Sequence, residues 1–329
     1  MLRRLLSYLF KYLILFRTFS YAKKIFKSSN VNARVISIGN ISVGGSGKTP
    51  LSIWLTLKLN QKGIKTALLE KGYKSGLRGD EVFISDGSKK VEASFIGDEP
   101  AMALSSLQGK ALLCVSKDKT RGAIELTRYH QDIKCIVVDD GFQHLKLHRD
   151  VDVVLMDSQE GFNGKLMPLG RLREPYTALK RATAVIFTKT DGLSEQNKKE
   201  LKLKVEAINK NIFIFFAGVK FFSSQNIDKL KILPVSSVSN YQFFHKKLRD
   251  SGAIFEKYIA HRDHHNFAKD DIDYIVKLFK STGADFVVYT SKDAVKVKEL
   301  LKQKGVPAVE VWYDHEIDRP EEFVKLCIG

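Results

Sequence analysis

A glycine-rich segment at residues 42–49, SVGGSGKT, constrains the fold of this chain more than any other feature. It follows a β-branched run at residues 34–38 (RVISI) and precedes a helix that we expect to start near Pro50, since proline suits a first helical turn. A strand, a glycine turn and a helix in this order are typical of a phosphate-binding loop, whose glycines let main-chain amides converge on phosphate oxygens. The sequence therefore predicts an α/β domain of the P-loop NTPase type.

All eight residues of this loop are predicted to bind nucleotide: Ser42, Val43, Gly44, Gly45, Ser46, Gly47, Lys48 and Thr49. Lys48 is placed to reach the β- and γ-phosphates of ATP, and the Thr49 hydroxyl is placed to bind Mg²⁺. Ser42 stands where the common pattern has glycine, a mild departure because three glycines still keep the backbone permissive. The alternative, a chance glycine turn, is disfavoured by the strand before the loop and the Lys-Thr pair that ends it.

A second acidic element follows at residues 136–140, IVVDD. An apolar strand that ends in carboxylates downstream of a phosphate loop has the form of a Walker B element. Asp139 is predicted to hold Mg²⁺, directly or through water, and Asp140 to orient a neighbouring group. The alternative is a solvated strand end.

Further apolar runs, separated by helical stretches, predict a mostly parallel sheet covered by helices; they lie at residues 66–69, 111–115, 135–138, 153–156 and 184–187. Residues 83–95, which turn at Asp86-Gly87, are predicted to form an inserted hairpin. A polar stretch from residue 220 marks a boundary, after which alternating strand and helix patterns predict a second, smaller α/β domain. The predicted parts are thus residues 1–28, 29–219 and 220–329, the last closing over the active site.

The first part, residues 2–19, repeats leucines at helical spacing, with Lys11 interrupting the apolar run well short of the ~20 residues that a membrane span needs. We interpret it as an amphipathic helix on an anionic membrane surface; the alternative is a helix packed against the protein's own core. With 54 Lys and Arg against 37 Asp and Glu, the chain favours anionic partners. No nucleic-acid-binding signature accompanies this charge, so nucleic acid is not an expected partner.

Several short motifs follow one another along the chain in a specific order. They lie at residues 37–50, Gly72-Tyr73, 97–100 (GDEP), 139–144 (DDGFQH), 147–150 (LHRD), 172–175 (LREP), 263–265 (DHH) and 292–296 (KDAVK). Together they resemble the tetraacyldisaccharide 4′-kinases, the lipid A 4′-kinases of Gram-negative bacteria. The resemblance implies transfer of the ATP γ-phosphate to the 4′-hydroxyl of a tetraacylated glucosamine disaccharide 1-phosphate. It also implies an enzyme of two α/β domains with the active site between them, attached to the cytoplasmic face of the inner membrane as a peripheral or monotopic protein.

The resemblance further implies roles for single residues. Asp98 is the expected base for the sugar hydroxyl, with His264 as its partner, and we expect domain closure to bring the two together. Arg173 is expected to neutralise phosphate charge. The alternatives are an N-cap for Asp98, a solvated loop for His264 and an ion pair with Glu174 for Arg173. Gln143 is a candidate metal ligand, and the expected supporting residues are Glu99, Asp140, Asp263 and Lys119.

Two lysines depart from the family pattern, because Lys71 and Lys119 stand where arginine is usual. Lysine keeps the charge but loses the bidentate fork, so any phosphate contact there would be less directional.

Two other functions compete with a lipid kinase. Residues 185–191 (VIFTKTD) resemble the guanine-reading element of P-loop GTPases, which would suit a GTP-driven switch or a metallocentre-loading protein. Nucleotide competition separates that reading from an ATP-dependent kinase. A soluble kinase of a small metabolite is the third possibility, and it leaves the N-terminal helix unexplained.

Overall fold

The computed structural model describes residues 2–73, 75–89, 91–238, 240–262 and 265–329, which form two units. The larger unit consists of three chain segments, Met1–Lys90, Ala103–Val219 and His315–Gly329. The smaller unit consists of two, Val91–Met102 and Lys220–Asp314. The chain therefore changes unit between residues 219 and 220, where the polar stretch begins, but it also crosses at three further places that the sequence did not indicate.

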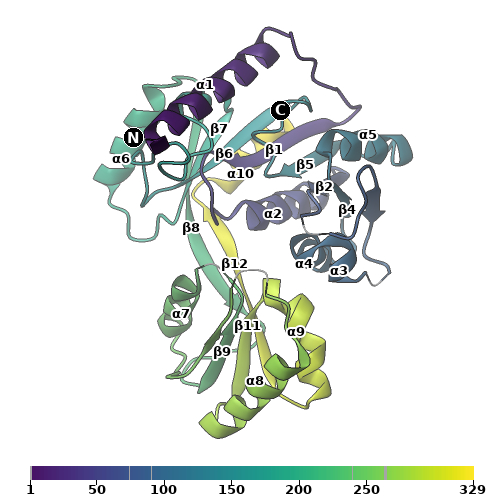
Figure 1. Ribbon diagram of the computed structural model, residues 1–329, viewed down its shortest axis with the longest axis vertical. Coiled ribbons are helices and arrows are strands. Elements are labelled where there is room, and N and C mark those ends of the chain that lie inside the picture. The colour runs from purple at the N-terminus through teal and green to yellow at the C-terminus, as the bar shows by residue number, and fades with distance from the viewer. Residues whose placement is uncertain (1, 74, 90, 239, 263–264) are drawn as a thin grey trace. The chain divides into compact units, whose positions relative to one another are not determined.

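The larger unit contains a sheet in the strand order β8-β7-β6-β1-β5-β2-β4-β3 (Figure 1). Its strands are β1 (Arg34–Asn40), β2 (Thr66–Glu70), β3 (Val82–Ser85), β4 (Leu112–Ser116), β5 (Cys135–Asp139), β6 (Val151–Asp157), β7 (Ala184–Thr188) and β8 (Phe213–Ser223). Neighbouring strands pair in parallel except β3 and β4, which pair antiparallel. The predicted mostly parallel sheet is confirmed, and its apolar strands are buried because helices cover both faces.

The predicted hairpin at residues 83–95 is wrong. Its first arm is β3, but β3 pairs with β4, and the expected second arm contains the short helix α3 (Ala93–Ile96). A two-residue turn signal at Asp86-Gly87 is local, whereas the partner of β3 is chosen by apolar packing against β4, about thirty residues further on.

Helices of the larger unit are α1 (Leu2–Ala22), α2 (Lys48–Gln61), α5 (Lys119–Tyr129), α6 (Glu195–Glu206) and α10 (Pro320–Ile328), with a 3₁₀ helix at Tyr176–Arg181. Helix α4 (Asp98–Leu107) begins in the smaller unit and ends in the larger one. Helix α10 belongs here because Phe323 stacks on Trp54 of α2, with ring centroids 6.2 Å apart, and the Arg34 guanidinium donates to the carbonyl of Cys327 at 2.7 Å.

The strands of the smaller unit form a parallel stretch of sheet in the order β10-β9-β11-β12. They are β9 (Ile232–Ser236), β10 (Ile259–Ala260), β11 (Phe286–Thr290) and β12 (Ala308–Ile317). Its helices are α3, α7 (Tyr241–Asp250), α8 (Lys269–Thr282) and α9 (Ser291–Gln303). Figure 1 shows α8 and α9 side by side along this sheet. Their apolar faces bury a core that includes Ile275, Val287 and Val297. The predicted second α/β unit is thus present.

The N-terminal helix α1 turns two serines, Ser7 and Ser20, into the larger unit and leaves most of its large apolar side chains in solvent. The Ser7 hydroxyl donates to the carbonyl of Leu166 at 3.2 Å, and the Arg17 guanidinium donates to the carbonyl of Gln143 at 2.7 Å. The alternative that this helix buries its apolar face in the protein's own core is therefore wrong. Among the described residues, no helix has the length and apolar character needed to span a bilayer.

Candidate active site

The phosphate loop connects β1 to α2 at the carboxyl edge of the larger sheet. Gly44 and Gly47 both have positive φ angles, +128° and +80°, which L side chains rarely adopt. The Asn40 amide donates to the Ser46 hydroxyl at 2.9 Å, and the Val43 amide donates to the carbonyl of Arg171 at 2.7 Å, so the loop is braced from two sides. Ser42, the departure from the usual glycine, forms an antiparallel bridge with Leu172.

Helix α2 begins at Lys48, two residues earlier than the predicted start near Pro50. Its N-cap is Gly47, whose lack of a side chain leaves the first turn without a side-chain cap. Free amides and the positive end of the helix dipole make such a terminus an anion site. The backbone of the loop therefore has the form that binds phosphate groups.

Asp140 joins two of the predicted cations at this edge. Its carboxylate lies 3.7 Å from the Lys48 ammonium and accepts from one nitrogen of the Arg173 guanidinium at 2.9 and 3.0 Å. Although burial would raise it, the pKa of Asp140 is lowered by Lys48, Arg173 and Lys119. Glu174, the alternative partner of Arg173, instead pairs with Arg181 at 2.7 Å. The structure thus gathers Lys48, Arg173 and Asp140 beside the loop.

Asp139 contacts the start of α2 directly. Its carboxylate accepts from the hydroxyls of Thr49 at 2.8 Å and of Ser52 at 2.9 Å. Burial raises the pKa of Asp139, against the opposing effects of Lys119 and the Thr49 hydrogen bond. The strand register explains the meeting, because β1 and β5 pair in parallel with Ile38 opposite Asp139.

The predicted metal ligands offer oxygen donors, which are the ligands that Mg²⁺ prefers. Thr49 and Asp139 are in contact. The Gln143 amide donates to the Asn40 carbonyl at 2.8 Å and to Glu174 at 3.0 Å. Its Oε1 is buried and has no hydrogen-bond partner within the described part of the chain. A buried carboxylate with a raised pKa and an unpartnered carbonyl oxygen are both groups that a bound divalent cation would satisfy, so these residues fit the ion.

Lys119, one of the two departures, is almost fully buried and points its ammonium at the main-chain carbonyls of Asp139 and Asp140. Burial lowers the pKa of Lys119, while the two carboxylates oppose that effect. Its role in the structure is to hold the end of β5, and a point charge suffices for that because main-chain carbonyls need no planar fork.

The predicted base, Asp98, opens α4 and lies in the smaller unit. Its carboxylate is 2.6 Å from the Lys296 ammonium, and both side chains are largely buried, at 17% and 8% exposure. Glu99 pairs with Lys292 at 3.6 Å, so α9 holds both acidic residues of this turn. The predicted boundaries put Asp98 in the kinase domain, and this is wrong, because the structure groups Asp98 with the smaller unit.

Two predicted residues, Asp263 and His264, lie outside the described residues. Their neighbours Arg262 and His265 belong to the smaller unit, as Asp98 does.

The structure adds residues that the sequence analysis did not assign. Lys296 lies in the KDAVK motif at residues 292–296. The two lysines of this motif are four residues apart, which places them on one face of a helix, and this spacing was the available signal. Ser52 follows Thr49 by three residues on α2, so helical periodicity alone could have placed it near Asp139. His315 gave no signal: its Nε2 lies 2.8 Å from the carbonyl of Gly47, across 268 residues of chain.

The GTPase-like element takes a different role in the structure. Asp191, which would read guanine, accepts from the amide of Val219 at 3.1 Å, and the Lys189 ammonium pairs with Asp157 at 2.5 Å. Both side chains are therefore engaged in holding the ends of neighbouring strands.

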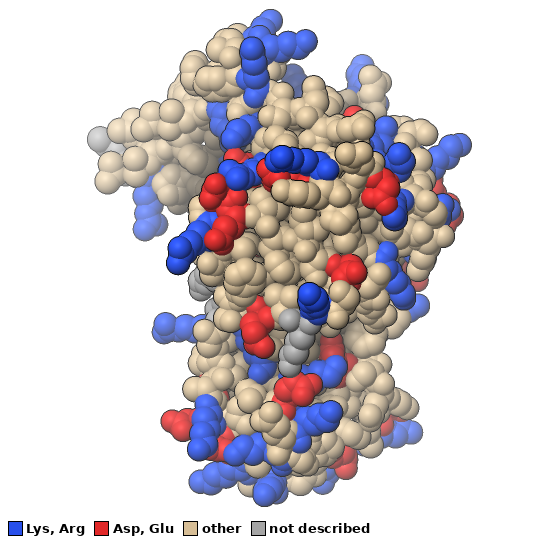
Figure 2. Space-filling model, turned by 90° about the vertical axis from the view of Figure 1, so that its right-hand side faces the viewer, with Lys and Arg blue, Asp and Glu red and all other residues tan. Residues whose placement is uncertain are grey.

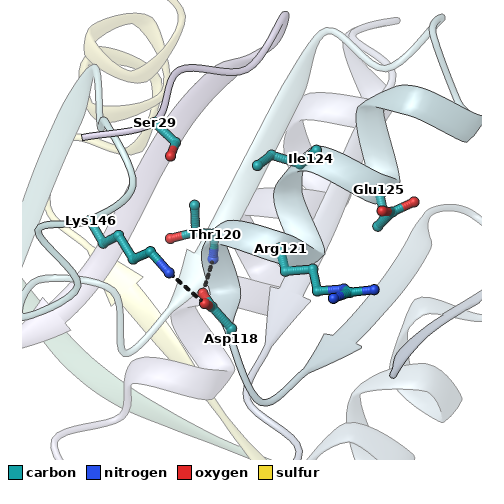
Figure 3. A pocket seen from close by; sticks show the side chains of 7 residues that line it. All are labelled: Ser29, Asp118, Thr120, Arg121, Ile124, Glu125 and Lys146. Carbon is teal, nitrogen blue, oxygen red and sulfur yellow. Dashed lines mark hydrogen bonds and ion pairs between the residues drawn. The ribbon is translucent and has the colours of Figure 1, made fainter. Parts of the chain in front are cut away.

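A hollow of about 460 Å³ lies beside the start of α5 (Figure 3). Figure 3 shows the Asp118 carboxylate accepting from the Thr120 amide and from the Lys146 ammonium, at 2.8 and 2.9 Å. Asp118 is thus paired with Thr120 and Lys146, and none of the predicted site residues lines the hollow.

We predict that His144 makes the stability of the protein depend on pH. Burial, and then the charge of Lys119, lowers the pKa of His144 from 6.5 to about 4. Between these values the unfolded chain takes up a proton that the folded chain excludes, so stability falls as the pH drops from 6.5 towards 4. Urea unfolding at pH 7.5 and pH 5 should show His144→Gln losing less stability than the parent, by about 1–2 kcal/mol after allowance for solvent screening.

The matched control is His148→Gln, which replaces an exposed histidine four residues away. Equal pH dependence of the parent and His144→Gln would contradict the prediction.

Comparison with known proteins agrees with this geometry. The family model described as Tetraacyldisaccharide-1-P 4′-kinase (LpxK) matches residues 1–326. A tetraacyldisaccharide 4′-kinase of Halothermothrix orenii is 33% identical over 315 residues, which cover 89% of this chain and 81% of that protein. One of Bdellovibrio bacteriovorus is 31% identical over 317 residues, covering 92% and 91%. A crystal structure of LpxK from Aquifex aeolicus in complex with ATP superposes with a TM-score of 0.77 at 25% identity, covering 99% of this chain and 98% of that one.

Proposed function

Because this chain belongs to the tetraacyldisaccharide-1-P 4′-kinase family, we propose that it moves the γ-phosphate of ATP onto the 4′-hydroxyl of tetraacyldisaccharide 1-phosphate, a step of lipid A biosynthesis. The single observation that carries this function is the junction of the phosphate loop with Asp139 and Asp140. There a lysine, an arginine and two carboxylates meet the free amide end of α2.

For phosphoryl transfer, the protein mainly has to position the two substrates and neutralise the charge on the phosphate groups. The loop amides and Lys48 bind the β- and γ-phosphates, and Arg173 neutralises charge that develops on the transferring group. Asp140 holds both cations until the nucleotide competes for them. Thr49, Asp139 and Gln143 would hold Mg²⁺, which would supply further charge neutralisation.

Asp98 takes the proton of the attacking sugar hydroxyl, with His264 as its partner and with Asp263 and Glu99 in support. The ion pair with Lys296 fixes the position of the Asp98 carboxylate. Lys48 and Asp98 lie in different units, and in the reaction the hydroxyl that Asp98 activates must attack the γ-phosphate that Lys48 binds. Turnover therefore requires the two units to close on the substrates.

The acceptor carries fatty chains, and α1 supplies a surface for its membrane. Ten large apolar side chains of this helix are exposed, and each is able to contribute about 1.5–3 kcal/mol when fully buried. Arginines and lysines of α1 and the following turn add attraction to anionic lipid, about 1 kcal/mol each near the surface. We place the protein on the cytoplasmic face of the inner membrane, peripheral or monotopic.

The charge elsewhere has a different distribution. On the face seen in Figure 2, Lys and Arg side chains are scattered among Asp and Glu side chains. On this face, the described residues form no continuous basic track for a polyanion. This supports our proposal that the anionic partners are the lipid surface and the phosphorylated substrates.

The function is tested with γ-labelled ATP, Mg²⁺ and tetraacyldisaccharide 1-phosphate, followed by chromatography of the extracted lipid. Label is expected in a lipid that carries one additional phosphate. Label transfer that requires GTP would favour a GTP-driven switch or a metallocentre-loading protein. Label transfer only to a water-soluble acceptor would favour a small-metabolite kinase. Either result would overturn the proposal.

The membrane role gives a separate prediction. Leu9 and Leu13 lie on the exposed face of α1, and their replacement by Glu is expected to lower binding to vesicles containing anionic lipid at least ~10-fold. The reason is that two leucines that would be buried in the lipid become two negative charges facing a negative surface. Vesicle flotation measures the bound fraction. Tyr129→Glu, at an exposed aromatic residue on α5, is the control and should float as the parent does. Equal flotation of all three proteins would exclude α1 as the anchor.

A further inference from the structure

Three side chains in the smaller unit form a cluster that the phosphotransfer reaction does not use. One imidazole nitrogen from each of His261 and His265 and one carboxylate oxygen of Asp271 lie within 4.8 Å of one another. His265 Nε2 is 2.9 Å from Asp271 Oδ2, and His261 Nε2 is 4.0 Å from Asp271 Oδ1. All three side chains are partly buried, with 24–30% of their surface exposed.

The fold holds these groups in place from three directions. The His261 amide, directly after β10, donates to the carbonyl of Ser236 at the end of β9, and the His265 amide donates to the carbonyl of Arg262. Asp271 lies in the first turn of α8 and accepts from the Ala268 amide at 2.8 Å. The donors are therefore fixed by a strand end, a turn and a helix cap.

The two imidazole rings stack, with centroids 4.0 Å apart and planes only 7° from parallel. The Phe267 ring stands edge-on to both rings, at 5.3 and 5.2 Å. Burial, and then the charge of the neighbouring His265, lowers the pKa of His261. Hydrogen bonds to the Ala268 amide and to His265 lower the pKa of Asp271. Neutral imidazole and ionised carboxylate are the forms that bind metal ions.

We infer that His261, His265 and Asp271 form a binding site for a divalent transition-metal ion of the Zn²⁺ class, with the fourth ligand position open to water. Two nitrogens and one oxygen suit Zn²⁺ or Co²⁺, whereas Mg²⁺ prefers oxygens alone. Ligand atoms around a tetrahedral Zn²⁺ are about 3.3–3.6 Å apart, so the present spacings of 2.9 and 4.0 Å need only small side-chain adjustments. The site is empty.

The contacts of Asp271 allow it to bind the ion and cap α8 together. Its Oδ2 receives the Ala268 amide, while Oδ1 faces His261. On the other side, the carbonyl of His265 accepts from the Lys296 ammonium at 3.0 Å, which holds the histidine's backbone against α9. An ion would therefore cross-link the end of β10 to the start of α8 and stabilise the smaller unit.

The test uses the tag-free full-length protein, titrated with Zn²⁺ against a chromophoric zinc chelator in the presence of millimolar Mg²⁺. One equivalent of Zn²⁺ is expected to bind and to raise the unfolding temperature, and Co²⁺ is expected to give the visible absorption of a four-coordinate ion. His261→Asn should weaken Zn²⁺ binding at least about tenfold, since loss of even an outer-shell partner of a metal ligand costs about 10–100-fold. This variant is decisive because it keeps the α8 cap, which Asp271→Asn would lose.

His148→Asn is the matched control, because it removes one exposed histidine from the larger unit and should bind Zn²⁺ as the parent does. Absence of stoichiometric binding to the parent would overturn the inference, and so would equal affinity of the parent and His261→Asn. Neither outcome depends on phosphotransfer, so a failure here is separable from a failure of the proposed function.

Discussion

Asp98→Asn is expected to lower kcat by roughly 10²–10⁴-fold while ATP still binds, since this is the usual contribution of a general base. Asparagine keeps the size of the side chain but cannot accept the proton of the sugar hydroxyl. The phosphate loop belongs to the other unit, so the substitution leaves the groups that we expect to bind ATP unchanged. Steady-state transfer of label to lipid measures kcat, and a fluorescent ATP analogue measures nucleotide affinity.

The same substitution leaves the Lys296 ammonium without its charged partner, and a folding defect would mimic loss of the base. Thermal unfolding of the variant therefore accompanies the kinetics. Asp270→Asn, which replaces an exposed carboxylate of the same unit, is the matched control and should retain parental turnover. Near-parental kcat of Asp98→Asn would show that another group removes the proton.

Lys48→Ala is expected to reduce label transfer by roughly 10²–10³-fold, the cost commonly found when one donor to a developing negative charge is removed. The lysine lies at the first residue of α2, where its charge adds to that of the helix terminus. Its loss also leaves Asp140 paired with Arg173 alone beside the loop, so ATP affinity should fall with kcat. Quantification of labelled lipid at saturating and limiting ATP separates the two effects.

Lys117→Ala, which removes an exposed lysine of the same unit, is the control for general loss of charge. Parental rates for Lys48→Ala would remove the basis for assigning the loop to phosphate binding.

Some of the site could be predicted because its determinants are local. The start of α2 is predicted to within two residues by the order of a strand, a glycine loop, a Lys-Thr pair and a helix. The carboxyl ends of two parallel strands lie at the same edge of the sheet. This is why Thr49 and Asp139 could be assigned to one metal site before any contact was known. The alternation of apolar runs with helical stretches likewise predicted both α/β units.

Other parts depended on partners far away in the chain. Gly47 meets His315 across 268 residues, and Asp98 meets Lys296 across 198 residues, although neither pair shares a periodic pattern. The segment Val91–Met102 joins the smaller unit for the same reason, and the expected hairpin fails because β3 finds β4.

The sequence by itself determined the phosphate loop, the family and the run of strands and helices, since backbone conformation and side-chain periodicity act over a few residues. The tertiary structure alone decided which unit holds Asp98, what Arg173 and Lys119 contact, and where α10 packs. Those outcomes follow from the burial of apolar surface and the pairing of buried charges between distant segments, and neither effect leaves a spacing that can be recognised along the chain.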